Sequence, residues 1–473
     1  MGSQYDFRAS KTPQVLPLDV LSLVPVAVFV LTIYLVYKHP SVKIPFTSKY
    51  VHIDYGYAPI IGVILLFLTF SIGVDAIWRG VMGVGNIRPY SILVIIVSFS
   101  YICVSLDYTG FFEYLSMRVI RLSRGSGKRL FIYIFLFASF LTLFTDNDIV
   151  ILTMTPIIIY TCRDAKINPI PFLFSMFFAA NIMSVTLYIG NPVNIIAADA
   201  AGLTFVPYMK WMLIPSILAE VVCLLLLWLV FRRKVPEKLV VPEVDLSRTL
   251  KDRSGALFGL TILVLSIAVF SISPGLTGVA PWVAPPFFAI AMFLHDLFRR
   301  RPYEGTGGIS QHSSLKEIIR RVPWKVIPFI IGLFIIVDGL ASAGWTDMLA
   351  SQLSRIGNPV LLTVAITYLS LALCNFMNNH PASIFLVRTF QSPLFIILAA
   401  SSVGSSLALI LGANFGANLT LMGSLAGLMW AKILSDKGQP VSFSEFSKYG
   451  LLIMPIVAAV ACLGLVAELA LWA

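Results

Sequence analysis

The chain has 473 residues, of which 58% are hydrophobic and only 12% are charged, and its mean hydropathy is +0.89. A soluble domain carries about twice that charged fraction, so the composition excludes a soluble enzyme and indicates a polytopic membrane protein. The net charge of +11 does not indicate a nucleic-acid partner, because the basic residues fall in short loops between apolar runs. The sequence predicts an all-α protein embedded in a lipid bilayer.

The first half of the chain is predicted to run from residue 18 to 231, after an extracytoplasmic tail at 1–17. Its apolar runs are long enough to cross a bilayer and are interrupted at two places. We expect full spans near 18–36, 57–73 and 90–106, an amphipathic helix at 109–123, a hairpin at 130–162, a broken span at 170–199 and a full span at 208–231.

The second half is predicted to run from 256 to 473 and follows a cytoplasmic linker at 232–255. It repeats the order of the first half. We expect full spans near 256–272, 279–297 and 325–342, a short helix at 345–356, a hairpin at 358–388, a broken span at 392–431 and a last span at 448–471.

The same polar interruption occurs in both halves. Residues 144–148 read Phe-Thr-Asp-Asn-Asp, and 376–380, about 232 residues later, read Phe-Met-Asn-Asn-His. Each is followed by a second interruption, at 180–194 and at 413–424. Unwound backbone at membrane depth survives only where protein or water satisfies its amides and carbonyls, so paired interruptions indicate a secondary transporter with one central site.

The charges of the loops predict the orientation. Arg and Lys cluster in alternate loops, whereas the loops at 200–207 and 273–281 contain neither. If both hairpins re-enter without crossing, every basic loop is cytoplasmic and about ten crossings place both termini outside the cell membrane. Each half then has an odd number of crossings, so the sequence predicts two inverted repeats.

The first hairpin tip offers Thr145, Asp146, Asn147 and Asp148. Two carboxylates at membrane depth are costly to keep, which favours a functional role. We expect Thr145 and Asn147 to bind substrate, and Asp146 or Asp148 to carry a coupling proton or to balance the charge of a coupling cation. The alternative is a tip near the cytoplasmic surface, where both aspartates are simply solvated.

The second hairpin tip offers Asn378, Asn379 and His380 and has no carboxylate. The two amides are expected to bind substrate. His380 occupies the position of Asp148 in the repeat, so a coupling role and a purely structural role both remain open for its imidazole.

The broken spans supply the remaining candidates for substrate binding. Glycine permits a sharp turn, proline removes an amide donor, and Asn, Thr and Ser side chains replace lost helix hydrogen bonds. A kink without a ligand is the alternative. The candidates are Gly190, Asn191, Asn194, Asn414, Asn418, Thr420, Gly423 and Ser424.

The acidic residues of the other predicted spans are expected to be interfacial or structural. They are Glu220 and Glu468, near the outer interface, and Asp107 and Asp338, at span ends. The chain has no phosphate-binding loop and no nucleophile–base or metal cluster, so we expect neither ATP hydrolysis nor another enzyme activity, and no cofactor or metal.

These motifs resemble the arsenite permease branch of the ion transporter superfamily, which also holds sodium–proton antiporters, silicon efflux carriers and dicarboxylate and citrate carriers. The resemblance covers about 88–470 and implies inverted repeats, re-entrant hairpins and a homodimer with an elevator-like motion. It is carried by Ser105-Leu-Asp-Tyr-Thr-Gly-Phe-Phe-Glu113, Asn147-Asp148, Leu152-Thr-Met-Thr-Pro156, Asn194-Ile-Ile-Ala-Ala-Asp199, Asn375-Phe-Met-Asn-Asn-His-Pro381 and Gly423-Ser-Leu-Ala-Gly-Leu-Met-Trp430.

Two departures from the branch leave the cargo open. Arsenite permeases tend to have Ser-Asn-Leu-Val-Asn where this chain has Gly190-Asn-Pro-Val-Asn194, which is closer to carboxylate and general anion carriers. The chain also has an additional Asp at 146. The Ser-Asn-Thr hairpin signatures of dicarboxylate carriers are absent from both tips, which counts against a dicarboxylate carrier.

The leading hypothesis is proton- or cation-coupled efflux of a small oxyacid such as arsenite or silicic acid, a neutral polyol that amides and hydroxyls can bind without an arginine clamp. The alternative is a sodium–proton antiporter or an inorganic or carboxylate anion transporter of the same fold. Association with a separate ATPase subunit also stays open.

The predicted topology can be tested with tags. We expect tags at both termini to report from outside the cell and tags at 240 or 310 to report from the cytoplasm, because the basic loops are cytoplasmic. Protease protection in intact and everted vesicles measures both. Termini on opposite sides would mean that a span has been miscounted.

Overall fold

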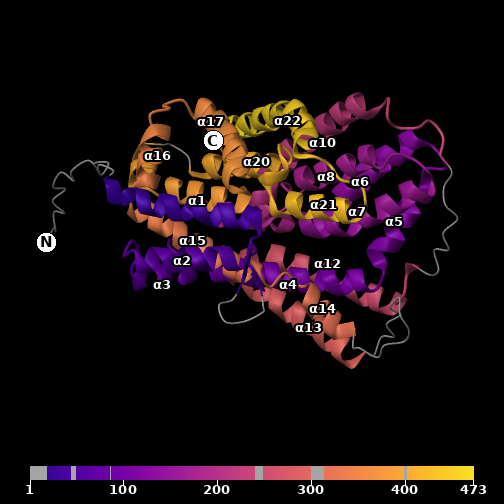
Figure 1. Cartoon of the computed structure of the whole chain (residues 1–473), viewed down its shortest axis with the longest axis horizontal. Coiled ribbons are helices and arrows are strands. Elements are labelled where there is room, and N and C mark those ends of the chain that lie inside the picture. Colours follow the sequence, from indigo (N-terminus) through magenta and orange to yellow (C-terminus); the bar gives the residue numbers. More distant parts are fainter. Residues whose placement is uncertain are drawn as a thin grey trace.

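The computed structural model describes residues 19–43, 50–85, 87–239, 249–299, 314–398 and 402–472. The predicted tail at 1–17, part of the linker at 232–255 and most of the loop at 298–324, including His312, lie outside the described residues. The described chain is a bundle of helices with one small sheet (Figure 1). The prediction of an all-α polytopic membrane protein is therefore confirmed, apart from that sheet.

The first half contains the helices that build the first hairpin and the first broken span. These elements are α1 (Leu23–Lys38), α2 (Tyr57–Leu68), α3 (Val74–Met82), α4 (Pro89–Tyr108), α5 (Phe111–Leu122), α6 (Gly127–Phe144), α7 (Asn147–Asp164), α8 (Ile170–Met183), η2 (Tyr188–Gly190), α9 (Pro192–Ala200) and α10 (Phe205–Phe231), with the short 3-10 turn η1 (Val20–Ser22) before α1.

The second half contains the helices that build the second hairpin and the second broken span. Its elements are α12 (Arg253–Thr277), η3 (Pro281–Val283), α13 (Ala284–Phe298), α14 (Ser314–Arg321), α15 (Val326–Ser342), α16 (Trp345–Leu353), α17 (Pro359–Met377), α18 (Asn379–Phe390), α19 (Pro393–Leu398), α20 (Ser402–Gly416), η4 (Leu421–Gly423), α21 (Leu425–Asp436) and α22 (Phe443–Trp472).

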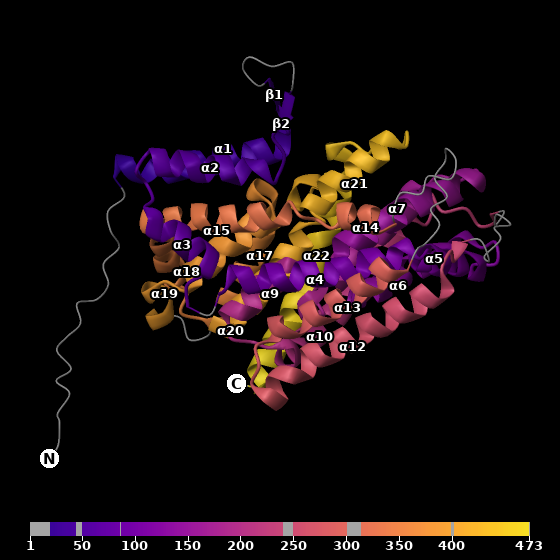
Figure 2. The same ribbon diagram turned by 90° about the horizontal axis from the view of Figure 1, so that it is seen from below.

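The sheet was not expected from the sequence. Strands β1 (Ser41–Lys43) and β2 (Tyr50–His52) pair antiparallel, with Val42 opposite Val51, and project from the helical body beside α1 and α2 (Figure 2). Every residue of both strands is exposed, so neither strand shows the alternation of buried and exposed side chains by which sequence patterns identify strands.

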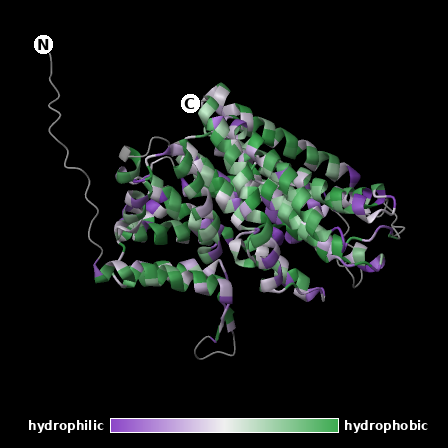
Figure 3. Ribbon diagram, turned by 90° about the horizontal axis from the view of Figure 1, so that it is seen from above, coloured by the Kyte–Doolittle hydropathy of each residue, from purple (hydrophilic) through white to green (hydrophobic). Residues whose placement is uncertain are grey.

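Nine helices in the described part of the chain are long and apolar enough to cross a membrane. They include α6 and α17, the first arms of the two hairpins, whereas α2, α8 and α20 are apolar but shorter. Most of the helical ribbon in Figure 3 has the colour of hydrophobic residues. Re-entry of the hairpins, and with it the count of about ten crossings and the outward termini, stays a prediction.

The two halves pack in corresponding ways. The first hairpin arm packs on the broken span of its own half, as α6 on α8 and as α17 on α20. The second arm packs on its own broken span and also on the far segment of the other half's broken span, as α7 on α21 and as α18 on α9. This exchange brings the hairpins and the breaks of both halves into one central region; the inversion of the repeats themselves stays a prediction.

Candidate functional site

The first hairpin turns through two residues between α6 and α7. Thr145 and Asp146 are both extended, and Asp146 Oδ1 accepts a hydrogen bond from the backbone N–H of Asp148 at 2.9 Å. An acidic N-cap satisfies a free amide at the start of a helix, so the carboxylate of Asp146 also holds the turn. Thr145 donates to the Leu141 carbonyl at 2.9 Å, which ends α6.

Asn147 is the buried residue of this tip. Its Nδ2 donates to Oδ1 of Asn181 in α8 at 2.7 Å, whereas its own Oδ1 is buried and has no partner among the described residues. Buried polar atoms are normally paired, so an unpaired carbonyl oxygen marks a place where a donor or a cation fits. Asn147 is thus fixed by one end of its amide and free at the other.

The second hairpin turns through a single residue. Asn378 ends α17 and begins α18 with φ +74°, a conformation that is unusual outside glycine, and its side chain accepts from the His380 N–H at 3.4 Å. Within the part of the chain that the structure describes, Asn378 Nδ2 and Asn379 Oδ1 are buried and have no partner. Each tip therefore offers unpaired amide atoms, with Asn378 in the position that Asp146 has in the first half.

His380 is buried behind this second tip. Its Nδ1 lies 3.4 Å from Asn378 Oδ1, and its ring packs edge-on against Phe329 of α15 with centroids 5.7 Å apart. No ion pair joins His380 to a carboxylate among the described residues. These contacts position Asn378, and a coupling role for His380 stays a prediction.

The first break is closed by its own asparagines. Asn191 caps α9 by accepting from the Val193 N–H at 3.0 Å, and Asn194 Nδ2 donates to the carbonyls of Ser184 and Leu187 at 2.7 and 3.0 Å. The Ser184 carbonyl lost its helical partner where α8 ended, and the Leu187 carbonyl, within the break, also accepts from the Gly190 N–H at 3.0 Å. A Cβ on Gly190 would lie 2.3 Å from the Ser184 carbonyl oxygen, so the chain can fold back only at a glycine.

The second break is built in the same way. Ser424 caps α21 by accepting from the Gly427 N–H at 3.1 Å, and Thr420 donates to Asn375 Oδ1 of α17 at 2.6 Å. A Cβ on Gly423 would lie 2.1 Å from the Gly416 carbonyl oxygen. Gly190 and Gly423 therefore perform the same task in the two halves.

The two breaks are joined to each other by a buried network of side-chain amides. Asn181 Nδ2 donates to Asn418 Oδ1 at 2.9 Å, and Asn418 Nδ2 donates in turn to the Phe178 carbonyl at 3.2 Å. Across the same contact, Asn414 Nδ2 donates to Asn194 Oδ1 at 2.9 Å. All four asparagines are fully buried, so they cross-link the halves rather than face solvent.

Two residues of this network were not among the predicted site residues. Asn181 bonds Asn147 on one side and Asn418 on the other, and Ser184 Oγ donates to Asn414 Oδ1 at 3.0 Å. The signal that could have found Asn181 is its correspondence to Asn414, 233 residues later, in the repeated Ala-Asn pair. Ser184 gives no comparable signal.

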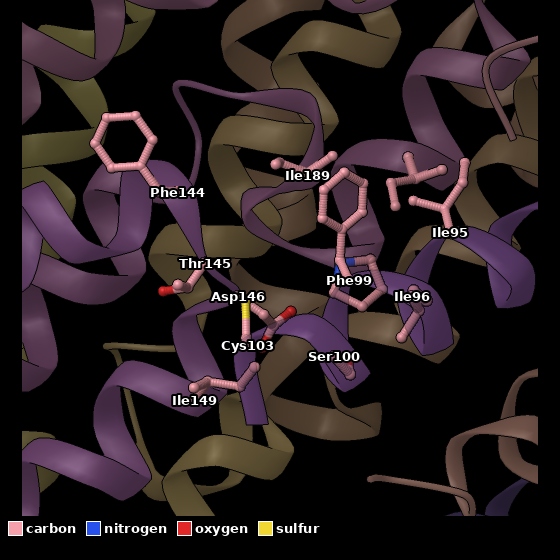
Figure 4. A pocket seen from close by; sticks show the side chains of 12 residues that line it. Ile95, Ile96, Phe99, Ser100, Cys103, Phe144, Thr145, Asp146, Ile149 and Ile189 are labelled. Atoms are coloured by element: carbon pink, nitrogen blue, oxygen red, sulfur yellow. The ribbon is translucent and has the colours of Figure 1, made fainter. Parts of the chain in front are cut away.

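A cavity with an empty volume of about 360 Å³, including its open mouth, adjoins the first tip (Figure 4). Its walls are mostly apolar side chains of α4 and α9, with Ser100, Cys103, Thr145 and Asp146 as its polar lining. It contains no residue of the second hairpin. The cavity thus reaches one of the two tips, and the meeting of Asn147 and Asn379 around one ligand stays a prediction.

Acids near the tips and acids elsewhere differ in their partners. Asp338 of α15 pairs with Arg79 of α3 at 2.8 Å and also with Arg388 of α18, and Asp107 lies 3.6 Å from Arg321. No ion pair of the described residues involves Asp146 or Asp148. Within the described chain, no three His, Cys, Asp or Glu side chains gather in a way that could hold a metal.

Broken helices, paired hairpins and buried amides in a bundle of apolar helices define a membrane transporter. Residues 14–404 match the citrate transporter family, and the chain belongs to this family. The predicted membership of the ion transporter superfamily is thereby confirmed.

Two similar proteins are described as arsenical pump membrane proteins. One, from Escherichia coli, is 26% identical over 91% of this chain and 95% of its own length. The other, from Yersinia enterocolitica, is 28% identical over 79% of this chain and 84% of its own length.

Among solved structures, the YdaH transporter of Alcanivorax borkumensis, which has an unusual topology, superposes with a TM-score of 0.57 over 96% of this chain and 99% of that one. At 13% identity this likeness concerns the fold alone.

The close backbone contacts at Gly190 and Gly423 lead to a stability prediction. We expect Gly190→Ala and Gly423→Ala to lower the yield and thermal stability of the purified protein, because the added methyl group would overlap a carbonyl oxygen. Gly275→Ala in α12 is the matched control, since a Cβ there meets nothing within 4 Å. Fluorescence-detected size exclusion after heating measures the difference, and equal stability of all three variants would contradict the packing at the breaks.

Proposed function

We propose that the protein is a secondary active transporter that exports a small oxyacid such as arsenite or silicic acid across the cell membrane, coupled to a proton or a cation. The observation that carries the proposal is the set of unpaired amide atoms at the two hairpin tips, Asn147 Oδ1, Asn378 Nδ2 and Asn379 Oδ1. Two acceptors and one donor suit the hydroxyl groups of a neutral oxyacid, each of which can donate and accept.

The charge at the tips and breaks favours this cargo over citrate. Residues 144–148, 190–194, 375–380 and 413–424 contain no Lys or Arg, and Arg388, the nearest arginine along the second hairpin, is paired with Asp338. A multivalent carboxylate normally needs cationic partners, and the carboxylates of Asp146 and Asp148 would repel it. The relatives described as arsenical pump membrane proteins support the same choice.

An anion transporter is the second candidate, because the family is described as citrate transporters and because the first break reads Gly190-Asn-Pro-Val-Asn194. Flux into everted vesicles, measured in parallel with arsenite, silicic acid, sodium and citrate, tests the choice. Uptake of citrate with no uptake of arsenite or silicic acid would overturn the oxyacid proposal.

The hairpin amides are proposed as substrate ligands. We expect Asn147→Ala and Asn379→Ala each to weaken arsenite binding about five- to 150-fold, since one lost ligand costs on the order of 1–3 kcal/mol. The exposed Asn168→Ala, outside both tips and both breaks, is the control. Equilibrium binding to purified protein in detergent measures the effect, and unchanged affinity in both tip variants would remove the amides from the site.

Coupling is proposed to involve the carboxylates at the first tip. We expect the double variant Asp146→Asn, Asp148→Asn to lose accumulation against a gradient while exchange of substrate down its own gradient persists, because the negative charge that a coupling ion needs is gone. Asparagine is also a favourable N-cap residue, so the change Asp146→Asn keeps a capping side chain at the start of α7. Counterflow and gradient-driven uptake in proteoliposomes separate the two steps, and full uphill transport in the double variant would end this assignment.

A further inference from the structure

A second acid lies between the first hairpin and the first break. Glu220 is the sixteenth of the 27 residues of α10, and its side chain is buried, with the residue only 6% exposed. The sequence had suggested a position near the outer interface, which the middle of a membrane-length helix does not support. One oxygen, Oε1, is hydrogen-bonded to the Ser139 hydroxyl of α6, and the other, Oε2, is buried without a partner.

The hydrogen bonds around Ser139 favour a protonated Glu220. The Ser139 hydroxyl oxygen lies 2.8 Å from the Phe135 carbonyl oxygen and is also bonded to Glu220. A hydroxyl has one proton and cannot donate to both acceptors. If Glu220 carries a proton and donates it to Ser139, Ser139 donates to Phe135 and every hydrogen bond has its hydrogen.

The surroundings of Glu220 also disfavour a charge. An ionised carboxylate buried in a membrane-spanning helix needs a cation or several donors, and Glu220 has one hydroxyl neighbour and no ion pair among the described residues. Asp296 of α13 is a useful contrast, because it accepts from Tyr101 at 3.0 Å and from Ser105 at 2.5 Å and lies 3.5 Å from His295. Asp296 thus has two hydroxyl donors and a neighbouring imidazole, whereas Glu220 has one hydroxyl neighbour.

The titratable groups of the elements around Glu220 form no bond or ion pair with it. Cys223, one turn along α10, is the nearest on its own helix, and α8 has none. The titratable groups of the other neighbouring elements lie toward helix ends or have partners elsewhere. They are Lys128, Arg129 and Tyr133 of α6, Tyr188 of η2, Arg253 of α12, and Glu445, Lys448, Tyr449, Cys462 and Glu468 of α22.

Hydroxyl groups extend from Glu220 in two directions. Ser216, one turn earlier on the same face of α10, is hydrogen-bonded to Thr186 in the first break at 2.8 Å. The buried hydroxyls of Ser139 and Thr142 are three residues apart and are therefore neighbours on the surface of α6, and Thr145 follows as the extended residue at which this helix ends. This row ends at the first hairpin tip.

We propose that Glu220 is a proton-binding site of this protein, which carries one proton through the transport cycle between the first hairpin and the first break. The inference rests on the proposed function and deepens it by naming a proton carrier separate from the acids of the tip. When the proton leaves, the O–H bond of Glu220 breaks, the proton passes to water, and the carboxylate accepts the hydrogen bond of Ser139. When it returns, the O–H bond forms again and Ser139 donates to the Phe135 carbonyl.

The first experiment detects the proton directly. Infrared spectra of the purified protein in lipid, recorded at neutral pH in ordinary and heavy water, should contain the carbonyl stretch of a protonated carboxylic acid. We expect this band to disappear in Glu220→Gln, to move to higher frequency in Ser139→Ala because a hydrogen bond is lost, and to persist in the control Glu445→Gln. A band that is unchanged in both Glu220→Gln and Ser139→Ala would overturn the proposal.

The second experiment tests coupling in proteoliposomes with an imposed pH gradient. We expect Glu220→Gln, which has the shape of the protonated side chain, to exchange arsenite but to lose accumulation driven by the pH gradient. Glu468→Gln, a change at the other buried glutamate, should retain it. Full pH-driven accumulation by Glu220→Gln would overturn the role of Glu220 as carrier.

The two experiments separate this inference from the proposed function. If the wild-type protein moves no arsenite, the oxyacid proposal fails, and the infrared band alone decides whether Glu220 binds a proton. If Glu220→Gln does not fold, the shift of the band in Ser139→Ala decides in the same way, because Ser139 contacts the acid and leaves it in place.

Discussion

The constraint on which this structure depends is the cost of ending a helix inside a membrane. Each of the two broken spans frees carbonyl and amide groups that water cannot reach, and the side chains of Asn191, Asn194, Thr420 and Ser424 satisfy them. Those buried amides then need partners of their own. The other half supplies them, through Asn181 with Asn418 and Asn194 with Asn414, so the polar centre and the close packing of the halves have one cause.

The amides of the breaks and the amides of the hairpin tips differ in whether their hydrogen bonds are satisfied. The amides of the breaks are engaged with one another, whereas the hairpin tips keep atoms with no partner inside the described protein. The acidic residues differ in a similar way in whether they have a cationic partner. Asp338 and Asp107 meet arginines from other helices and hold elements together, whereas no ion pair of the described residues involves Asp146, Asp148 or Glu220. An ionised acid without a cation is costly inside a membrane protein, which is the physical basis of the coupling role proposed for these residues.

Much of this arrangement could be predicted from the sequence, because a polar residue inside an apolar run is an unambiguous signal. The tips at 144–148 and 376–380 and the glycines of both breaks are turns in the structure. Other features carry no such signal. The strands at Ser41–Lys43 and Tyr50–His52 are too short and too exposed to alternate, and Ser184 is a single hydroxyl whose importance arises only from its bond to Asn414. The depth of Glu220 depends on where α10 begins and on which face packs inward.

The reciprocal packing of α7 on α21 and of α18 on α9 has a consequence for the biosynthesis of the protein. The ribosome synthesises the first half before the second half exists. Asn181 and Asn194 therefore enter the bilayer before their partners Asn418 and Asn414 are made. Until then the first half has only its internal hydrogen bonds, such as those of Asn181 with Asn147 and of Asn194 with the Ser184 and Leu187 carbonyls. The bonds from Asn181 to Asn418 and from Asn414 to Asn194 can form only when the second half is in place, so the polar centre is completed last.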